Sequence, residues 1–144
     1  MLKIEHLTKS YGEKKAVNDL SFKVKEGEFF AFLGVNGAGK STTINIICGQ
    51  LSKDSGRVEI CGTDIDKDPD RIKRSLGVVF QSSVLDKDLS VRDNLESRAA
   101  LYGIHGAEFK KRLSYLSGLL EFEDLLRRPV GKLSGGQRRR IDIA

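Results

Sequence analysis

The sequence has no long apolar run. Its longest uninterrupted apolar stretch reaches only from Phe29 to Leu33, whereas a membrane-spanning helix needs roughly 20 apolar residues. The stretch is also too short for the apolar core of a signal peptide. We therefore expect a cytosolic chain, unless a partner holds it at a membrane.

Cysteine is scarce, and neither sign of charge dominates. Cys48 and Cys61 are the only two cysteines and form no CxxC pair, which argues against a metal or redox site of that kind. Each lies in an apolar stretch, so both are expected to be buried free thiols. The 25 basic and 20 acidic residues are interspersed, a pattern typical of a solvated surface rather than a nucleic-acid interface. With 39% hydrophobic residues, the composition is that of an ordinary globular protein.

The first half of the chain alternates between strand and helix patterns. Period-2 alternation at Leu20, Phe22 and Val24 predicts a half-buried strand. The continuous apolar runs Glu28–Leu33 and Leu76–Phe80 predict strands covered on both faces. Further predictions are a helix with an apolar stripe at Ile44, Ile47, Cys48 and Leu51, a short strand at 57–61, and a helix opened by Pro69. This order is typical of an α/β fold with a largely parallel core sheet.

The second half reads as helical. Ser90 and Asp93 form a capping-box-like start, and Gly103 is predicted to end the helix. A second amphipathic helix carries Phe109, Leu113, Leu116 and Leu120. No strand pattern occurs between Asp86 and Lys132. We therefore predict a helical subdomain at 86–132, set on a core made of residues 1–85 and 133–144.

A glycine-rich turn carries the first chemical motif. The segment Gly34-Val35-Asn36-Gly37-Ala38-Gly39-Lys40-Ser41 matches the phosphate-binding pattern GxxxxGK[ST] and lies between a predicted buried strand and a predicted helix. Glycines let the backbone N–H groups converge on an anion, and the helix N-terminus favours negative charge. Lys40 is expected to reach the β- and γ-phosphates of ATP, and the Ser41 hydroxyl to bind Mg²⁺. A glycine turn with a surface lysine is the alternative, but the strand–turn–helix context argues against it.

The second motif is Leu133-Ser134-Gly135-Gly136-Gln137. With this motif downstream of a phosphate loop, the chain resembles the ABC-transporter ATPases, whose signature is LSGGQ. The resemblance implies a P-loop NTPase core with N-terminal antiparallel strands and an inserted helical subdomain. It also implies that Ser134, Gly135, Gly136 and Gln137 grip the γ-phosphate of ATP held by a second subunit, in a head-to-tail dimer. Ser134 suits a helix cap, and the two glycines expose backbone N–H groups.

The same resemblance gives meaning to two isolated residues. Tyr11, in a Tyr-Gly turn, matches the family's adenine-stacking aromatic, although a tyrosine in a turn is more often simple packing. Gln81, directly after the Leu76–Phe80 run, matches the glutamine that looks toward Mg²⁺ and the attacking water and senses the transmembrane partner. Lys40 and Gln81 are thus the catalytic candidates, Ser41 and Gln81 the Mg²⁺ candidates, and Gly34, Asn36, Gly37, Ala38, Gly39 and Thr42 complete the ATP site.

The resemblance also suggests a setting. The segments Phe80–Leu95 and Leu133–Ala144 look most like ATPase subunits of drug- and antibiotic-export systems, which implies a separate permease at the cytoplasmic face of the membrane. Arg138, Arg139 and Arg140 could suggest nucleic-acid binding, but consecutive helical residues point about 100° apart and form no flat patch. Non-transport ABC ATPases of translation or DNA repair are the alternative. Repair members carry long coiled coils or zinc modules between the two motifs, and neither occurs here.

The family's catalytic acids have no counterpart in this sequence. In the family, the strand after the signature helix carries an Asp-Glu pair, which holds Mg²⁺ and orients water. The acids of 121–124 interleave with apolar residues in a helical pattern, and Asp142 lies within the signature helix, so neither qualifies. The expectation is a core whose C-terminal part is missing and a chain that binds ATP without turning it over.

Overall fold

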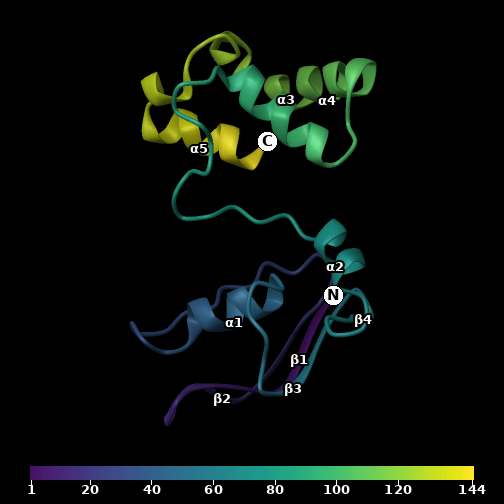
Figure 1. The fold of residues 1–144 in the computed structure, drawn as a ribbon, viewed down its shortest axis with the longest axis vertical. Helices are drawn as coiled ribbons and strands as arrows, with labels where there is room; N and C mark the ends of the chain where they lie inside the picture. The colour runs from purple at the N-terminus through teal and green to yellow at the C-terminus, as the bar shows by residue number, and fades with distance from the viewer. The chain divides into compact units, whose positions relative to one another are not determined.

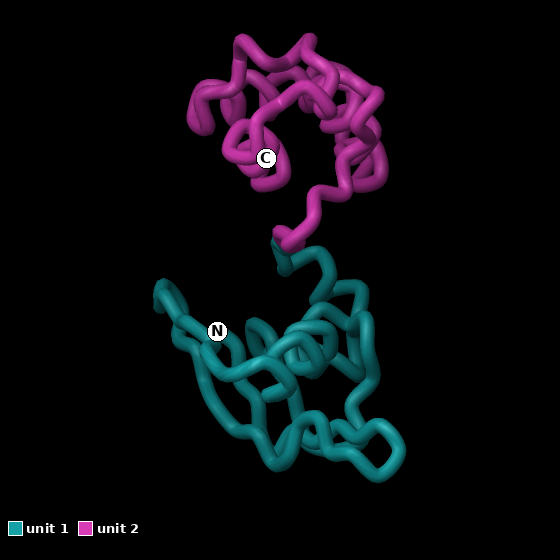
Figure 2. The backbone as a smooth tube through the Cα atoms, turned by 90° about the vertical axis from the view of Figure 1, so that its left-hand side faces the viewer, with its two compact units in different colours: residues 1–78 teal, residues 79–144 magenta.

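The chain divides between Val78 and Val79 into two units, which are described separately (Figure 2). The structure is a computed structural model that describes residues 1–144. The first unit is a sheet with two helices, and the second is helical. None of the helices is both long and apolar enough to cross a bilayer.

A four-stranded antiparallel sheet forms the framework of the first unit (Figure 1). Its strands are β1 (Leu2–Tyr11), β2 (Lys14–Val24), β3 (Ser55–Ile60) and β4 (Thr63–Asp64), in the order β2-β1-β3-β4. The predicted strand at Leu20–Val24 is confirmed as part of β2, and residues 57–60 of the strand predicted at 57–61 belong to β3. Helix α1 (Lys40–Ile47) follows the glycine-rich turn, and α2 (Pro69–Ser75) begins at Pro69 behind an Asp68 cap.

An irregularity in the β1–β2 pair sets which side chains face the core. His6 and Asp19 both adopt positive φ, 51° and 53°, at a register shift between the two strands. The His6 Nδ1 and Asp19 Oδ1 atoms lie 2.7 Å apart. Residues three apart on a regular strand face opposite sides, but this irregularity places Ile4 and Leu7 in the same buried cluster.

Helix α1 packs on the sheet through Ile46. That side chain is fully buried and joins Ile4, Leu7, Val17 and Val58 in one cluster. Ile47 and Leu51 are partly buried against it, as predicted, but Ile44 is 47% exposed, so its place in the apolar stripe was predicted wrongly. The helix therefore contacts the sheet through Ile46 and, in part, Ile47, and not through Ile44 as the spacing suggested.

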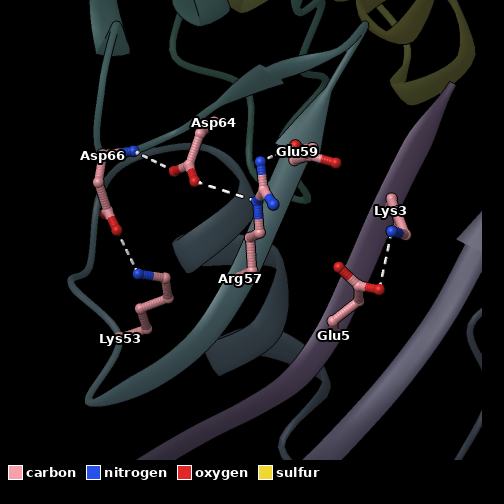
Figure 3. A network of polar contacts seen from close by, with 7 residues as sticks. All are labelled: Lys3, Glu5, Lys53, Arg57, Glu59, Asp64 and Asp66. Carbon is pink, nitrogen blue, oxygen red and sulfur yellow. Dashed lines mark hydrogen bonds and ion pairs between the residues drawn. The ribbon is translucent and has the colours of Figure 1, made fainter.

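Charged side chains cover the exposed side of the sheet (Figure 3). Lys3 pairs with Glu5 at 2.7 Å, and Arg57 lies between Glu59 and Asp64. The hydrogen bond from Lys3 lowers the pKa of Glu5 below its usual range. Exposed pairs of this kind contribute little stability. They do keep β3 and the short edge strand β4 solvated, which discourages edge-to-edge pairing.

The two expected core strands are not strands in the structure. Glu28–Leu33 and Leu76–Phe80 pair with no other segment, and the sheet contains only antiparallel pairs. Phe29 is 96% exposed and Leu33 85% exposed, while Val78, Val79 and Phe80 are each about 40% exposed. An apolar run indicates a segment that favours burial, but a strand also needs a neighbouring strand to hydrogen-bond with. Neither segment has one.

The second unit is built from helices around one apolar cluster. It contains α3 (Val91–Leu101), α4 (Gly106–Leu119), the 3-10 turns η1 (Glu123–Leu125) and η2 (Val130–Lys132), and α5 (Gly135–Ile143). Ser90 caps α3 by accepting from the Asp93 N–H, as predicted. The cluster's largest fully buried side chains are Phe122, Leu125 and, from α5, Ile141. The assignment of 133–144 to the ATP-binding core and 86–132 to a subdomain stays a prediction.

The cysteines are free, as predicted, but neither is fully buried. Cys48 follows α1 and is partly buried, and this burial raises the pKa of its thiol. Cys61 is exposed in the turn between β3 and β4, where it adopts a φ of 50°. Its apolar neighbours Val58 and Ile60 are buried, whereas the turn carries Cys61 to the surface.

Candidate functional site

The glycine-rich turn and the start of α1 form an open loop in the first unit. Gly37 and Gly39 have φ values of 86° and 81°, which L-residues rarely adopt. The Ala38 N–H donates to the Val35 carbonyl, which closes the turn. Residues Gly34 to Ala38 are exposed, so the loop is accessible to a ligand.

The N-terminus of α1 presents free backbone donors. The first backbone N–H to donate within the helix is that of Thr43, which bonds to the Gly39 carbonyl at 2.8 Å. The N–H groups of Lys40, Ser41 and Thr42 come before it and have no helical acceptor. No acidic residue lies in the first turn of α1. The loop is therefore suited to an anion such as phosphate.

Lys40 folds back over the loop. Its Nζ donates to the carbonyl oxygens of Gly34 and Val35, at 2.6 and 2.7 Å. These bonds hold the ammonium group against the loop, where its positive charge would attract a phosphate. Ser41 lies in the first turn of α1 and is exposed, so its hydroxyl is free to bind a cation beside that phosphate.

Strand β2 supports the loop from behind. A β-carbon built on Gly39 would lie 2.2 Å from the Ala16 carbonyl oxygen and 3.1 Å from Val17 Cγ2. Ala16 follows closely on Lys14, which pairs with Tyr11 across the β1–β2 hairpin. The end of the β1–β2 hairpin that carries Tyr11 therefore lies close to the loop, because β2 contacts Gly39 through Ala16. The Tyr11 side chain is 54% exposed, which leaves its ring able to contact a ligand.

The signature segment Leu133–Gln137 forms the N-terminus of α5 in the second unit. The Ser134 hydroxyl accepts from the Gln137 N–H at 3.2 Å, and the Ser134 N–H donates to Gln137 Oε1 at 2.9 Å. This reciprocal capping box occupies the Gln137 side chain. Gly135 and Gly136 are exposed, with open space where side chains would be. The segment therefore presents backbone N–H groups at a helix N-terminus.

Gln81 lines a cavity in the second unit that also touches α5. The cavity has a volume of about 390 Å³, and Gln81, Ser83, Gly135, Arg139 and Asp142 are among its lining residues. Ser83 and Arg139 link the two segments beside this cavity, residues 80–83 and α5. Ser83 Oγ donates to Asp142 Oδ1 at 2.7 Å, and the Arg139 guanidinium donates to the Phe80 carbonyl.

The three consecutive arginines bond to backbone carbonyls at three different places. Arg138 donates to Leu133, Arg139 to Phe80, and Arg140 to both Leu120 and Glu121. Arg140 thus binds the carbonyls at the C-terminus of α4, a favourable place for a cation. The side chains point apart, as predicted, and they serve to hold the second unit together.

Comparison with known proteins decides the family. The family described as ABC transporter matches residues 17–144. The chain belongs to the ABC transporter family of ATP-binding proteins. The fold class expected from the resemblance is confirmed by solved structures of this family. CbiO1 from Clostridium perfringens, part of the ABC transporter complex CbiONQ, is 32% identical with a TM-score of 0.88, covering 99% of this chain and 59% of its own. The dimeric ABC transporter cassette MJ0796 is 32% identical with a TM-score of 0.80, covering 99% and 67%.

The curated relatives of this ABC protein include export and resistance proteins. Nod factor export ATP-binding protein I from Ralstonia nicotianae is 41% identical, over 100% of this chain and 45% of its own length. Linearmycin resistance ATP-binding protein LnrL from Bacillus subtilis is 40% identical, over 99% and 46%. Daunorubicin resistance ATP-binding protein DrrA2 from Streptomyces coeruleorubidus is 35% identical, over 99% and 44%. The chain spans less than half the length of these relatives.

The structure divides the predicted site residues between the two units. Tyr11 and Gly34–Thr42 lie in the first unit, and Gln81 and Ser134–Gln137 in the second. Sequence reasoning missed Ala16, Ser83 and Asp142. No local pattern marks Ala16 or the Ser83–Asp142 pair, because the partners are far apart in sequence. The capping role of Gln137 was readable from the Ser-x-x-Gln spacing.

Proposed function

We propose that this chain is the MgATP-binding part of an ABC ATPase that powers export of a small molecule through a separate membrane permease. The observation that carries the proposal is the loop at Gly34–Ser41. There, left-handed glycines, free N–H groups of α1 and the Lys40 ammonium surround one exposed site. These features together favour a polyphosphate over a neutral ligand.

Each site residue has a defined task in this proposal. The backbone of Gly34, Asn36, Gly37, Ala38 and Gly39, with Lys40 and Thr42, holds the phosphates, and the Tyr11 ring stacks on adenine. Ser41 and Gln81 would hold Mg²⁺, which supplies neutralisation of charge on the phosphate oxygens. Gln81 would also act on the water that attacks the γ-phosphate.

The signature segment would act on a second nucleotide. Ser134, Gly135, Gly136 and Gln137 are proposed to contact the γ-phosphate of ATP bound to a second ABC subunit, in a head-to-tail dimer. Gly135 and Gly136 carry this role best, because nothing lies within 4 Å of where their side chains would be. Gln137 in addition stabilises the helix cap, because its Oε1 accepts a hydrogen bond from the Ser134 N–H.

The export setting is supported by the relatives. The Nod factor, linearmycin and daunorubicin proteins are named for export or resistance, and a translation or repair role has no comparable support. A permease partner and a place at the cytoplasmic face of the membrane follow from this setting. A nucleic-acid partner is not proposed, since Arg138, Arg139 and Arg140 are engaged within the unit.

Calorimetric titration with MgATP tests the proposal. Lys40→Ala should lose most of the affinity, because it removes the one cation held on the loop, while the fold survives. Lys25→Ala is the matched control, since its exposed side chain makes no ion pair. Equal affinity in wild type and Lys40→Ala would contradict the proposal. Phosphate release by this chain should stay at background, because the acids of 121–124 interleave with apolar residues and the Asp142 carboxylate is bonded to Ser83.

A further inference from the structure

The segment that carries Gln81 is anchored to α5 on both sides of Gln81. Before it, the Phe80 carbonyl accepts a hydrogen bond from Arg139. After it, the Ser83 hydroxyl donates to Asp142 at 2.7 Å. Arg139 and Asp142 are three residues apart on α5, so they lie on one face of that helix. Gln81 therefore sits between two attachments to a single helix face.

The second attachment is continuous with the core of the unit. The Ser83 Oγ also accepts a hydrogen bond from the Leu85 N–H at 3.3 Å. Leu85 is 8% exposed and belongs to the same apolar cluster as Ile141, the neighbour of Asp142. Ser83 and Asp142 are both partly buried. The Ser83–Asp142 bond thus joins two backbones that are already held close by packing.

Between the two attachments, the backbone is free of regular structure. Gln81 and Ser82 are exposed and belong to no helix or strand. Both line the cavity of about 390 Å³, which Gly135 of the signature segment also lines. The cavity leaves the Gln81 side chain room to change rotamer, while the attachments hold the ends of its segment.

We propose that Ser83 and Asp142 are positioning residues that couple Gln81 to the signature helix α5. This inference rests on the proposed function, in which Gln81 faces the nucleotide of its own subunit and Gly135 faces that of the second. A displacement of Gln81 by one nucleotide would then be transmitted to α5 through the Ser83–Asp142 bond. Neither residue touches a nucleotide in this scheme, so their role is to transmit position.

Amide hydrogen exchange on this chain tests the coupling. In Asp142→Ala, exchange at the Leu85 N–H, which donates to Ser83 Oγ, should rise about tenfold, the size expected when a hydrogen bond to a charged acceptor is removed from a local opening. Asp142→Asn keeps an oxygen that accepts from Ser83, so it should stay close to wild type. The side-chain amide NMR signals of Gln81 should move in Asp142→Ala and return in Asp142→Asn. Asp88→Ala is the control, because Asp88 lies in the same unit and its exposed carboxylate accepts no hydrogen bond.

Two further measurements keep the outcomes separate. Ser83→Ala removes the donor of the Ser83–Asp142 hydrogen bond and should raise exchange as much as Asp142→Ala does. If Asp142→Ala fails to fold, Ser83→Ala still tests the bond. The Ser83 and Asp142 variants should keep most of the MgATP affinity, because the loop at 34–42 carries the phosphate contacts, whereas Lys40→Ala loses it. If Lys40→Ala binds MgATP normally, the proposed function is wrong, but the exchange data still test whether the Ser83–Asp142 bond holds the Gln81 segment to α5. Wild-type exchange in both alanine variants, or an Asp142→Asn variant as mobile as Asp142→Ala, would overturn the coupling.

Discussion

The Ala16 carbonyl oxygen lies where a side chain on Gly39 would have to be. A β-carbon at Gly39 would approach that oxygen to 2.2 Å, well inside contact distance. Gly39 also has a φ of 81° and directly precedes α1. Glycine is therefore required there for two reasons, backbone conformation and close approach. Through this contact, the backbone of β2 packs directly against the glycine-rich loop.

Replacing Gly39 with alanine should therefore destabilise the first unit and weaken MgATP binding. Gly37→Ala is the matched comparison, because its φ of 86° is equally unfavourable but nothing lies within 4 Å of its added carbon. We expect Gly37→Ala to cost roughly 1–2 kcal/mol for the left-handed backbone and Gly39→Ala distinctly more. Urea unfolding monitored by circular dichroism measures the difference. Equal midpoints for the two variants would show that the Ala16 contact is not tight.

Tyr11 should hold adenine with its ring face rather than its hydroxyl. Base–aromatic stacking is worth roughly 1–3 kcal/mol by alanine substitution, so Tyr11→Ala should bind ATP about 5- to 150-fold more weakly. Tyr11→Phe keeps the ring and should bind nearly as well as wild type. Calorimetry gives both affinities, with the exposed Tyr102→Ala in the second unit as the control. Equal losses in the phenylalanine and alanine variants would mean that the hydroxyl, not the ring, makes the contact.

Asp54 should make the stability of the first unit depend on pH. Its carboxylate accepts hydrogen bonds from Lys9 Nζ and from the Ser10 N–H, both at 2.7 Å. The Lys9 bond, then the Ser10 bond, lowers the pKa of Asp54 below the ordinary 3.8. The stabilisation is therefore fully present above pH 3.8 and is lost as pH falls through the lower, folded-state pKa.

Thermal melts of wild type and Asp54→Asn across this range check the sign. The wild type should melt higher at neutral pH, and the gap should close as the acid range is entered. Asp88→Asn, whose exposed carboxylate contacts no cation, should show no such gap. A gap that widens toward acid pH would contradict the assignment.

The unpaired apolar segment at 28–33 should make this chain associate with copies of itself. Phe29 and Leu33 are almost fully exposed, and the rings of Phe22, Phe30 and Phe32 stack beside them, with the Phe22 and Phe30 centroids 5.1 Å apart. Exposed apolar surface of this kind promotes association. Light scattering should show oligomers that dissociate in a Phe29→Ser, Leu33→Ser double variant. A monodisperse wild-type monomer with high thermal stability would refute this expectation.

Several features were readable from the sequence because they depend on neighbours along the chain. The glycine-rich turn before α1, the Ser90 and Ser134 caps and the Pro69 helix start each need only a few adjacent residues. Backbone conformation and capping are local, so the residue types at the right spacing suffice. The two motifs indicated the family for the same reason.

Other features were decided only by the tertiary structure. Glu28–Leu33 reads as a buried strand, yet no segment pairs with it. Ile46 rather than Ile44 is buried because the sheet meets α1 on that side, where Val17 and Val58 lie. The contacts Ala16–Gly39 and Ser83–Asp142 join residues far apart in the chain. Burial and pairing depend on what arrives from elsewhere in the fold, and apolar periodicity carries no information about the partner.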